Sequence, residues 1–202
     1  MEHDFKQVGR WQEGIDGDTL FSSTVFHKDA INWVMSDIFG QGSIQMIKFR
    51  SGITLSIQRR RFKHPTKLYA QNNMECFGFN FCLSGFERHK VNGIGKDVPF
   101  RQDNNGFILA KNGYQWQFDV PVEQNFLLIS IGLTSNIFRE IVCDQKERLP
   151  SVFQSVCDDK IPEFESVTMP STPQIRLALT QMLNPSLEKW SLFLDHHFMS
   201  LG

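Results

Sequence analysis

The sequence has no long hydrophobic run and no excess of charge of one sign. No window is apolar over the length that a membrane-spanning helix needs, and the N-terminus lacks the basic region and apolar run of a secretory signal. With 21 basic and 22 acidic side chains, the formal net charge is −1, so the chain lacks the broad positive surface of a nucleic-acid-binding protein. We therefore expect a cytoplasmic protein with no membrane partner.

Reactive motifs are also scarce. The four cysteines, at positions 76, 82, 143 and 157, show no CxxC spacing, which favours reduced thiols over disulfides or zinc ligands. Ser84 lacks the Gly-x-Ser-x-Gly context of a hydrolase nucleophile, and neither Cys76 nor Cys82 has an obvious partner histidine in the sequence. No glycine-rich phosphate loop of the usual kinds is present. We therefore predict no catalytic residue and no cofactor.

The chain is rich in phenylalanine, with 19 among 202 residues, and in short alternating apolar segments. The clearest covers residues 77–85, and similar segments cover 44–49, 53–59, 86–92, 105–111, 114–120 and 125–133. Turn signals separate them at Asn92-Gly93, residues 104–106 and Asn112-Gly113. This pattern predicts a small antiparallel β-barrel, in which the phenylalanines form the core or line a cavity for a large apolar ligand.

After Gly132 the apolar period becomes helical. Ser135 is a candidate N-cap for one helix, and Thr172 followed by Pro173 starts another. A third helix, which opens at Asn184-Pro185, carries an apolar stripe on one face. The stripe consists of Leu187, Trp190, Leu194, Phe198 and Leu201. We expect it to form a homodimer interface, and because its helix reaches the end of the sequence without a stop signal, we expect the chain to be part of a longer protein.

These patterns divide the chain into three regions. Residues 1–42 are expected to be an N-terminal arm or irregular segment, in which residues 30–39 form a short helix or lie on the barrel. Residues 43–134 are the expected barrel, and residues 135–202 the expected helical dimerisation or linker segment. The predicted fold class is therefore mainly β with an α tail.

One family shows the same order and spacing of five segments: residues 51–57, 79–85, a hairpin over 107–118, 128–133 and Leu149-Pro150. In these segments the chain resembles the N-terminal sensor domain of AraC-family transcription regulators, especially the siderophore-responsive branch. The resemblance implies a cupin-like barrel (a jelly roll) that binds a small effector, and helices that mediate dimerisation. It also implies a C-terminal pair of helix-turn-helix motifs. That half is absent here, so DNA is a partner only through the missing domain.

The alternating segment that begins at Ile53 ends in a basic run, Arg59-Arg60-Arg61. If the face of Ile53, Leu55 and Ile57 continues, Arg59 and Arg61 should point inward and Arg60 outward, as a solvated rim or as a mouth for an anionic effector. The predicted ligand-binding residues are Arg59, Arg61, Phe79, Phe81, Trp116 and Phe118. The effector is expected to be a siderophore or another metabolite, with fatty acids, sugars and aromatic compounds left open.

A cupin-fold enzyme, either an isomerase or a dioxygenase, is the main alternative, together with a free-standing small-molecule binder. Such enzymes hold a metal with a His-x-His pair and further ligands that converge on one ion. Here His64 lies in a basic turn and His89 has no neighbouring histidine, while His196 and His197 point about 100° apart on a predicted helix. We therefore expect no metal and a binding module that is not an enzyme.

Overall fold

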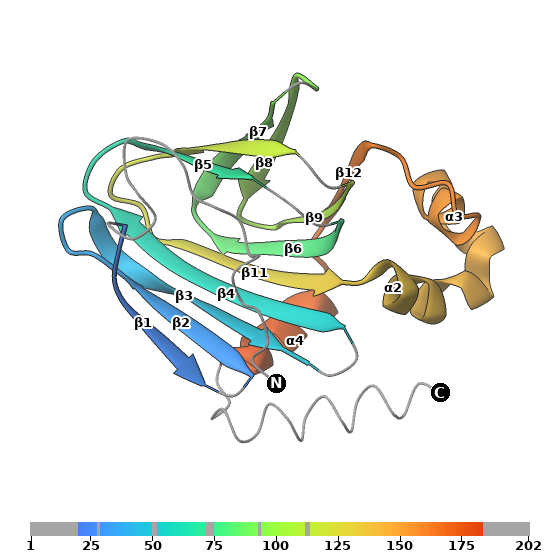
Figure 1. Ribbon diagram of the computed structural model, residues 1–202, viewed down its shortest axis with the longest axis horizontal. Coiled ribbons are helices and arrows are strands. Elements are labelled where there is room, and N and C mark those ends of the chain that lie inside the picture. The colour runs from blue at the N-terminus through green and yellow to red at the C-terminus, as the bar shows by residue number, and fades with distance from the viewer. Residues whose placement is uncertain are drawn as a thin grey trace. The chain divides into compact units, whose positions relative to one another are not determined.

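Two antiparallel β-sheets face each other (Figure 1). The computed structural model describes residues 20–27, 29–49, 52–71, 75–92, 94–111 and 114–183. The larger sheet runs in the order β1 (Phe21–His27), β2 (Ala30–Met35), β3 (Gly40–Lys48), β4 (Ile53–Phe62), β11 (Phe126–Leu133), β6 (Cys76–Ser84), β9 (Asn104–Ala110) and β12 (Phe164–Pro170). The smaller runs β5 (Thr66–Gln71), β10 (Gln115–Val120), β7 (Phe86–Val91) and β8 (Lys96–Arg101). The predicted mainly β fold is confirmed.

Three short helical segments follow β11 directly. They are α2 (Ser135–Val142), the 3₁₀ segment η2 (Cys143–Arg148) and α3 (Ser151–Cys157). The N-cap of α2 is Thr134 and not Ser135, because the Thr134 hydroxyl accepts a hydrogen bond from the Ile137 amide at 3.4 Å. Across the described residues, no helix combines the length and apolar character needed to cross a membrane.

Another helix, α4 (Pro173–Met182), belongs to a separate compact unit. The chain divides into the units Met1–Pro170 and Ser171–Gly202. Thr172 caps α4 by accepting a hydrogen bond from the Ile175 amide at 3.2 Å, with Pro173 in the first turn. The helix start predicted from Thr172 and Pro173 is therefore confirmed.

Several strands lie where the sequence did not predict them. Residues 30–35, expected as a helix or arm, form β2, which pairs with β3. Residues 104–106, expected as a turn, begin β9, and the chain turns just before them at Asp103, whose φ is +69°. The hairpin expected over residues 107–118 does not form, because β9 lies in the larger sheet and β10 in the smaller. Strands β1, β5, β8 and β12 were not predicted.

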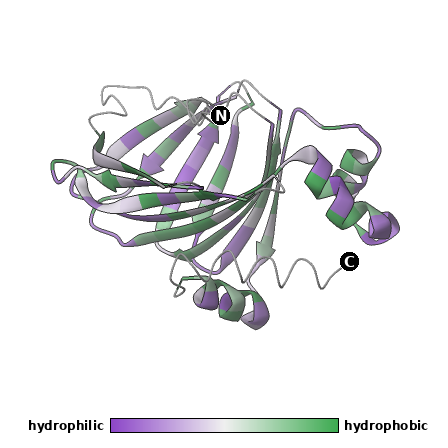
Figure 2. Ribbon diagram, turned by 60° about the horizontal axis from the view of Figure 1, so that its bottom comes forward, coloured by the Kyte–Doolittle hydropathy of each residue, from purple (hydrophilic) through white to green (hydrophobic). Residues whose placement is uncertain are grey.

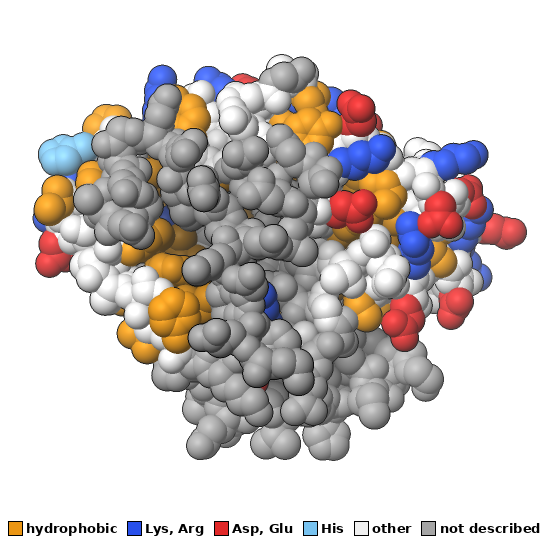
Figure 3. Space-filling view, in the orientation of Figure 1, with side chains coloured by type: hydrophobic (Ala, Val, Ile, Leu, Met, Phe, Trp, Pro, Cys, Tyr) orange, Lys and Arg blue, Asp and Glu red, His pale blue; other side chains and the backbone are white. Residues whose placement is uncertain are grey.

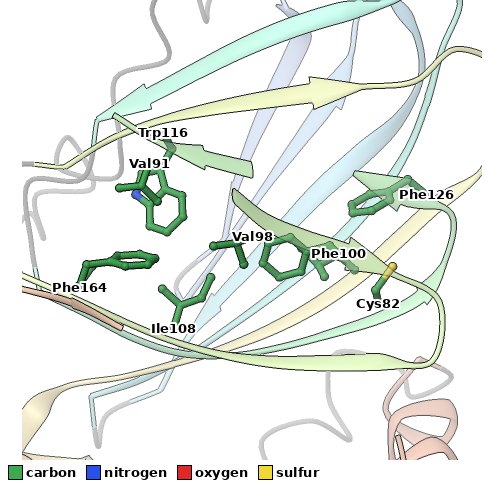
Figure 4. Close-up of a cluster of buried hydrophobic side chains, with 10 residues drawn as sticks. Cys82, Val91, Val98, Phe100, Ile108, Trp116, Phe126 and Phe164 are labelled. Atoms are coloured by element: carbon green, nitrogen blue, oxygen red, sulfur yellow. The ribbon is translucent and has the colours of Figure 1, made fainter. Parts of the chain in front are cut away.

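The interior between the two sheets holds a hydrophobic core. Its buried members are Cys82, Val91, Val98, Phe100, Ile108, Ala110, Trp116, Phe126, Leu128 and Phe164. Figure 4 shows Val98 and Phe100 of the smaller sheet directed toward Ile108 and Cys82 of the larger one. Both sheets therefore contribute side chains to one shared interior.

A second core lies on the opposite face of the larger sheet, against α2 and α3. There Phe77, Phe107 and Leu109 pack with Phe138, Phe153 and Val156. Figure 2 shows that these helices carry both hydrophobic and hydrophilic residues, and Figure 3 shows acidic and basic side chains gathered over their outer side. The helices thus cover strands β6 and β9 with an apolar face and leave a charged face to solvent.

A disulfide joins η2 to α3, which corrects the prediction of reduced thiols for this pair. Cys143 and Cys157 are bonded, with their Cα atoms 5.6 Å apart. The fourteen-residue separation carries no recognisable motif. The two cysteines meet because the chain reverses between the helices, which sequence spacing alone does not reveal. Cys82 is a free thiol and is buried.

Candidate functional site

Arg60 is the arginine of β4 that points into the interior. It is 6% exposed, whereas Arg59 and Arg61 are both exposed. Arg60 pairs with Phe126 of β11, a member of the interior core, while Ile57 points to the opposite face and is buried there. The prediction that Arg59 and Arg61 point inward is therefore wrong. Both faces of this central strand are covered, so its apolar alternation does not mark the interior.

Strand β7 brings two more ionisable residues into the same interior. Its alternation places Glu87, His89 and Val91 on the buried side and Arg88 on the solvent side. Glu87 has no exposed surface and His89 is 6% exposed. An acid and a histidine on the buried side of an otherwise amphipathic strand are unusual, because burying a charge costs free energy unless the charge is paired.

The connection from β6 to β7 fixes where Glu87 enters the interior. Gly85 adopts a φ of +83°, and a Cβ there would lie 2.8 Å from the Asn125 carbonyl oxygen. Only glycine fits this turn without a shift of the backbone. The side-chain amide of Gln124 hydrogen-bonds to both the amide and the carbonyl of Phe86. The Gly85 turn and the Gln124 side chain together fix the position of the first residues of β7.

Arg60, Glu87 and His89 form one buried group, here called the charged cluster. The Arg60 Nη2 atom donates to Glu87 Oε2 at 2.8 Å, and His89 Nε2 lies 2.9 Å from the same oxygen. The cluster links β4 of the larger sheet to β7 of the smaller one. Two of its buried atoms, Arg60 Nε and Glu87 Oε1, have no hydrogen-bond partner among the residues that the structure describes.

Aromatic rings surround the charged cluster. The Arg60 guanidinium carbon lies 5.0 Å from the centre of the Phe126 ring, a cation–π distance. The His89 ring lies 4.2 Å from Phe100 and 4.3 Å from Phe118, between centroids. A second polar group, Ser130 and Asn80, pairs on the same inner face of the larger sheet at 2.7 Å. The interior therefore combines hydrogen-bonding groups with aromatic surface, as small-molecule sites usually do.

The environment fixes the protonation of the cluster. Burial raises the pKa of Glu87, but the Arg60 guanidinium and His89 outweigh it and hold that pKa below its ordinary value of 4.5. Burial lowers the pKa of His89 below 6.5, and the opposing effect of the Glu87 carboxylate does not reverse this. At neutral pH the cluster is therefore guanidinium, carboxylate and neutral imidazole, with no net charge.

The histidine predicts a pH dependence of stability. Because the pKa of His89 is lower in the folded than in the unfolded chain, the unfolded chain binds the extra proton, and stability falls as pH drops below about 6.5. We expect His89→Gln to flatten the free energy of unfolding between pH 7.5 and 5, by up to about 1.4 kcal/mol per pH unit. Urea titrations at several pH values measure this slope. His64→Gln, at an exposed histidine, should keep the wild-type slope; equal slopes for both variants would contradict the assignment.

The remaining predicted binding residues separate into two groups. Trp116 is 7% exposed and lies in the interior core, and Phe118 is half-buried beside His89. Phe79 and Phe81 are half-buried on the opposite face of β6, where Phe79 packs 4.8 Å from Phe107. Two of the six predicted residues therefore line the interior beside the charged cluster, and four do not.

Glu87 and His89 were missed as site residues. The sequence signal that could have found them is the alternation within residues 86–91. Side chains on one face of a strand recur every second residue, so Glu87 and His89 lie on the same face as the apolar Val91. The predicted dimerisation residues Leu187, Trp190, Leu194 and Phe198 lie outside the described residues.

The interior offers little for metal or thiol chemistry. Within the described part of the chain, no three His, Cys, Asp or Glu side chains are placed to hold a metal ion. Burial, followed by the nearby charge of Glu87, raises the pKa of the Cys82 thiol to about 12. The thiol therefore stays protonated at neutral pH, in a form that is a poor nucleophile and ligand.

Several solved structures resemble the chain distantly. ToxT of Vibrio cholerae O395, bound to (E)-4-(8-methylnaphthalen-1-yl)but-3-enoic acid, gives a TM-score of 0.43 at 10% identity, covering 74% of this chain and 56% of ToxT. The AraC-like transcriptional activator CuxR gives 0.36 at 5% identity, covering 59% and 44%. A Cupin 2 conserved barrel domain protein from Salinispora arenicola CNS-205 gives 0.35 at 10% identity, covering 48% and 78%.

The chain spans only about half of the length of the two regulators. No curated protein sequence matches it. A family model does: the regulatory protein PchR N-terminal domain matches residues 39–190, well over half of the sequence. The chain therefore belongs to the family of PchR N-terminal regulatory domains.

Proposed function

We propose that this chain is the effector-sensing and dimerisation domain of an AraC-type transcription regulator in the cytoplasm. The effector, a siderophore or another small metabolite, binds between the two sheets against the charged cluster. The observation that carries this proposal is a buried cluster of ionisable side chains, two of whose atoms find no partner within the described ranges, in a domain of a regulatory family. If the interior served only to stabilise the fold, apolar side chains in place of the charged cluster would be at least as stabilising.

The packing of the larger sheet supports a route from the interior to the helices. Strands β6 and β9 present Cys82 and Ile108 to the interior and Phe77 and Phe107 to α2 and α3. An effector that binds one arrangement of the sheets better than another would shift the population of both faces together. In the intact protein we propose that this shift changes the DNA binding of a C-terminal helix-turn-helix domain.

A thermal-shift screen of siderophores, fatty acids and sugars tests effector binding. A ligand at one hundred times its Kd should stabilise the folded chain by about 2.7 kcal/mol. We expect Phe118→Leu to reduce this stabilisation and Phe81→Leu, on the opposite face of the larger sheet, to preserve it. The proposal fails if no compound class raises the melting temperature, or if the two variants respond alike.

Dimerisation is tested separately. We propose that Leu187, Trp190, Leu194 and Phe198 bury their apolar stripe against a second copy of the chain. Light scattering should then give a dimer for the wild type and a folded monomer for Leu194→Asp/Phe198→Asp. A wild-type chain that stays monomeric at high concentration would contradict this part of the proposal.

A further inference from the structure

The ion pair in the charged cluster uses only half of its hydrogen-bonding capacity. A guanidinium and a carboxylate can pair through two parallel hydrogen bonds. Here Glu87 Oε2 takes both contacts, from Arg60 Nη2 at 2.8 Å and from His89 Nε2 at 2.9 Å. Arg60 Nε, a donor, and Glu87 Oε1, an acceptor, are buried, and no group in the described part of the chain pairs with either. Native interiors pair nearly all such groups, so these two atoms mark a place for a further polar group.

The charges of the cluster restrict what that group can be. The positive charge of Arg60 is already compensated by Glu87, whose side chain is wholly buried. A carboxylate entering the interior would lose its hydration and bring a second negative charge beside Glu87. An uncharged group avoids both costs. To satisfy both open atoms it must donate one hydrogen bond and accept another.

The rings around the cluster restrict the rest of the molecule. Phe100 and Phe118 lie against His89, and Phe126 lies against Arg60. These surfaces favour an apolar, ring-containing body beside the polar group.

We propose that the effector presents to Arg60 and Glu87 an uncharged group that both donates and accepts a hydrogen bond, such as a hydroxyl or a carboxamide, carried on an apolar ring-containing body. This inference rests on the proposed function, because it takes the interior as the effector site. The group accepts from Arg60 Nε and donates to Glu87 Oε1. Discrimination against other ligands of the same shape follows, since a hydrocarbon leaves both protein atoms unpaired, and an ether, which only accepts, leaves Glu87 Oε1 unpaired.

Four fragments that share one ring test the inference on the 202-residue chain. Benzyl alcohol and benzamide donate and accept, benzyl methyl ether only accepts, and benzoate is an anion. Each is titrated by NMR, with the imidazole signals of His89 and the indole signal of Trp116 as readouts, assigned through His89→Gln and Trp116→Phe. We expect the alcohol and the amide to bind at least tenfold more tightly than the ether and benzoate.

A neutralised cluster provides the matched control. Arg60→Met/Glu87→Gln removes both charges together and leaves no charge unpaired. In this variant the preference for the alcohol over the ether should fall below threefold. The wild-type ranking alone decides the question if the variant does not fold.

Two results would overturn the inference and are distinguishable from failure of the proposed function. Benzoate binding at His89 and Trp116 as tightly as benzyl alcohol would show an anionic effector and leave effector binding standing. If all four fragments leave both signals unmoved, the donor–acceptor site does not exist. Effector sensing is then decided by the compound screen with Phe118→Leu and Phe81→Leu.

Discussion

Replacing Arg60 with methionine should lower the free energy of unfolding by about 3–5 kcal/mol, because it leaves the buried Glu87 carboxylate without its cation. The Glu87 side chain has no exposed surface, and the Arg60 side chain is only 4% exposed, so water cannot replace the lost partner without a rearrangement. Urea denaturation at pH 7.5, followed by circular dichroism, measures the loss. Arg59→Met, one residue earlier in the same strand and exposed, should change stability by less than about 0.5 kcal/mol.

The pH dependence of the Arg60→Met variant provides a second test. Without the guanidinium, only His89 opposes the effect of burial, so we expect the folded pKa of Glu87 to rise above the unfolded value. A group of that kind destabilises the fold when it is ionised, so the deficit of the variant should shrink as pH falls toward the pKa of Glu87. Arg60→Met/Glu87→Gln, which removes both charges, should regain most of the loss. A loss below about 1 kcal/mol for Arg60→Met would show that the pair contributes little.

The sequence was sufficient to locate most strands of the two sheets, because alternation with a period of two is a local property. The predicted segments around residues 53–59, 86–92 and 125–133 correspond to β4, β7 and β11. The strands that were missed have weaker local signals. Strand β8 contains Pro99 and charged residues, which an edge strand tolerates. Strand β12 was missed for a different reason: it follows three helical segments, in a region where the sequence predicted only helices.

Which face of a strand lines the interior could not be read from the sequence. In β6, Cys82 faces the interior and Phe77 faces the helices, and both are buried. Alternation predicts one buried face, so it does not show that such a strand is covered on both sides or which side lines the interior. The same ambiguity reversed the prediction for Arg59, Arg60 and Arg61.

The charged cluster itself depends on tertiary structure. Arg60 and Glu87 are 27 positions apart and lie in different sheets, so their pairing follows from the way the two sheets are superposed. Trp116 and Phe118 face the interior because β10 is apolar on one side alone, with Gln115, Gln117 and Asp119 on the other.

The second large effect is expected at Phe107, which joins the larger sheet to the helices. Its side chain has no exposed surface, and its ring lies 4.6 Å from Phe153 and 5.5 Å from Phe138, between centroids. Phe107→Ala removes these contacts and opens a cavity, so we expect a loss of about 3–5 kcal/mol in the free energy of unfolding. Phe26→Ala, at a ring that is 66% exposed on the edge strand β1, should cost less than about 0.5 kcal/mol.

The Phe107 variant also separates the two cores by function. The ring points away from the interior, since its register partner Phe79 lies on the helix-facing side of β6. We therefore expect the folded fraction of Phe107→Ala still to bind benzyl alcohol at the His89 and Trp116 signals, with the change in Kd measuring the coupling between the two faces. The change should instead weaken the packing of α2 and α3, seen as faster amide hydrogen exchange in those helices than in β4 and β11. Uniformly faster exchange with weakened binding would show that the two faces of the larger sheet respond as one unit, even when only the outer core is altered.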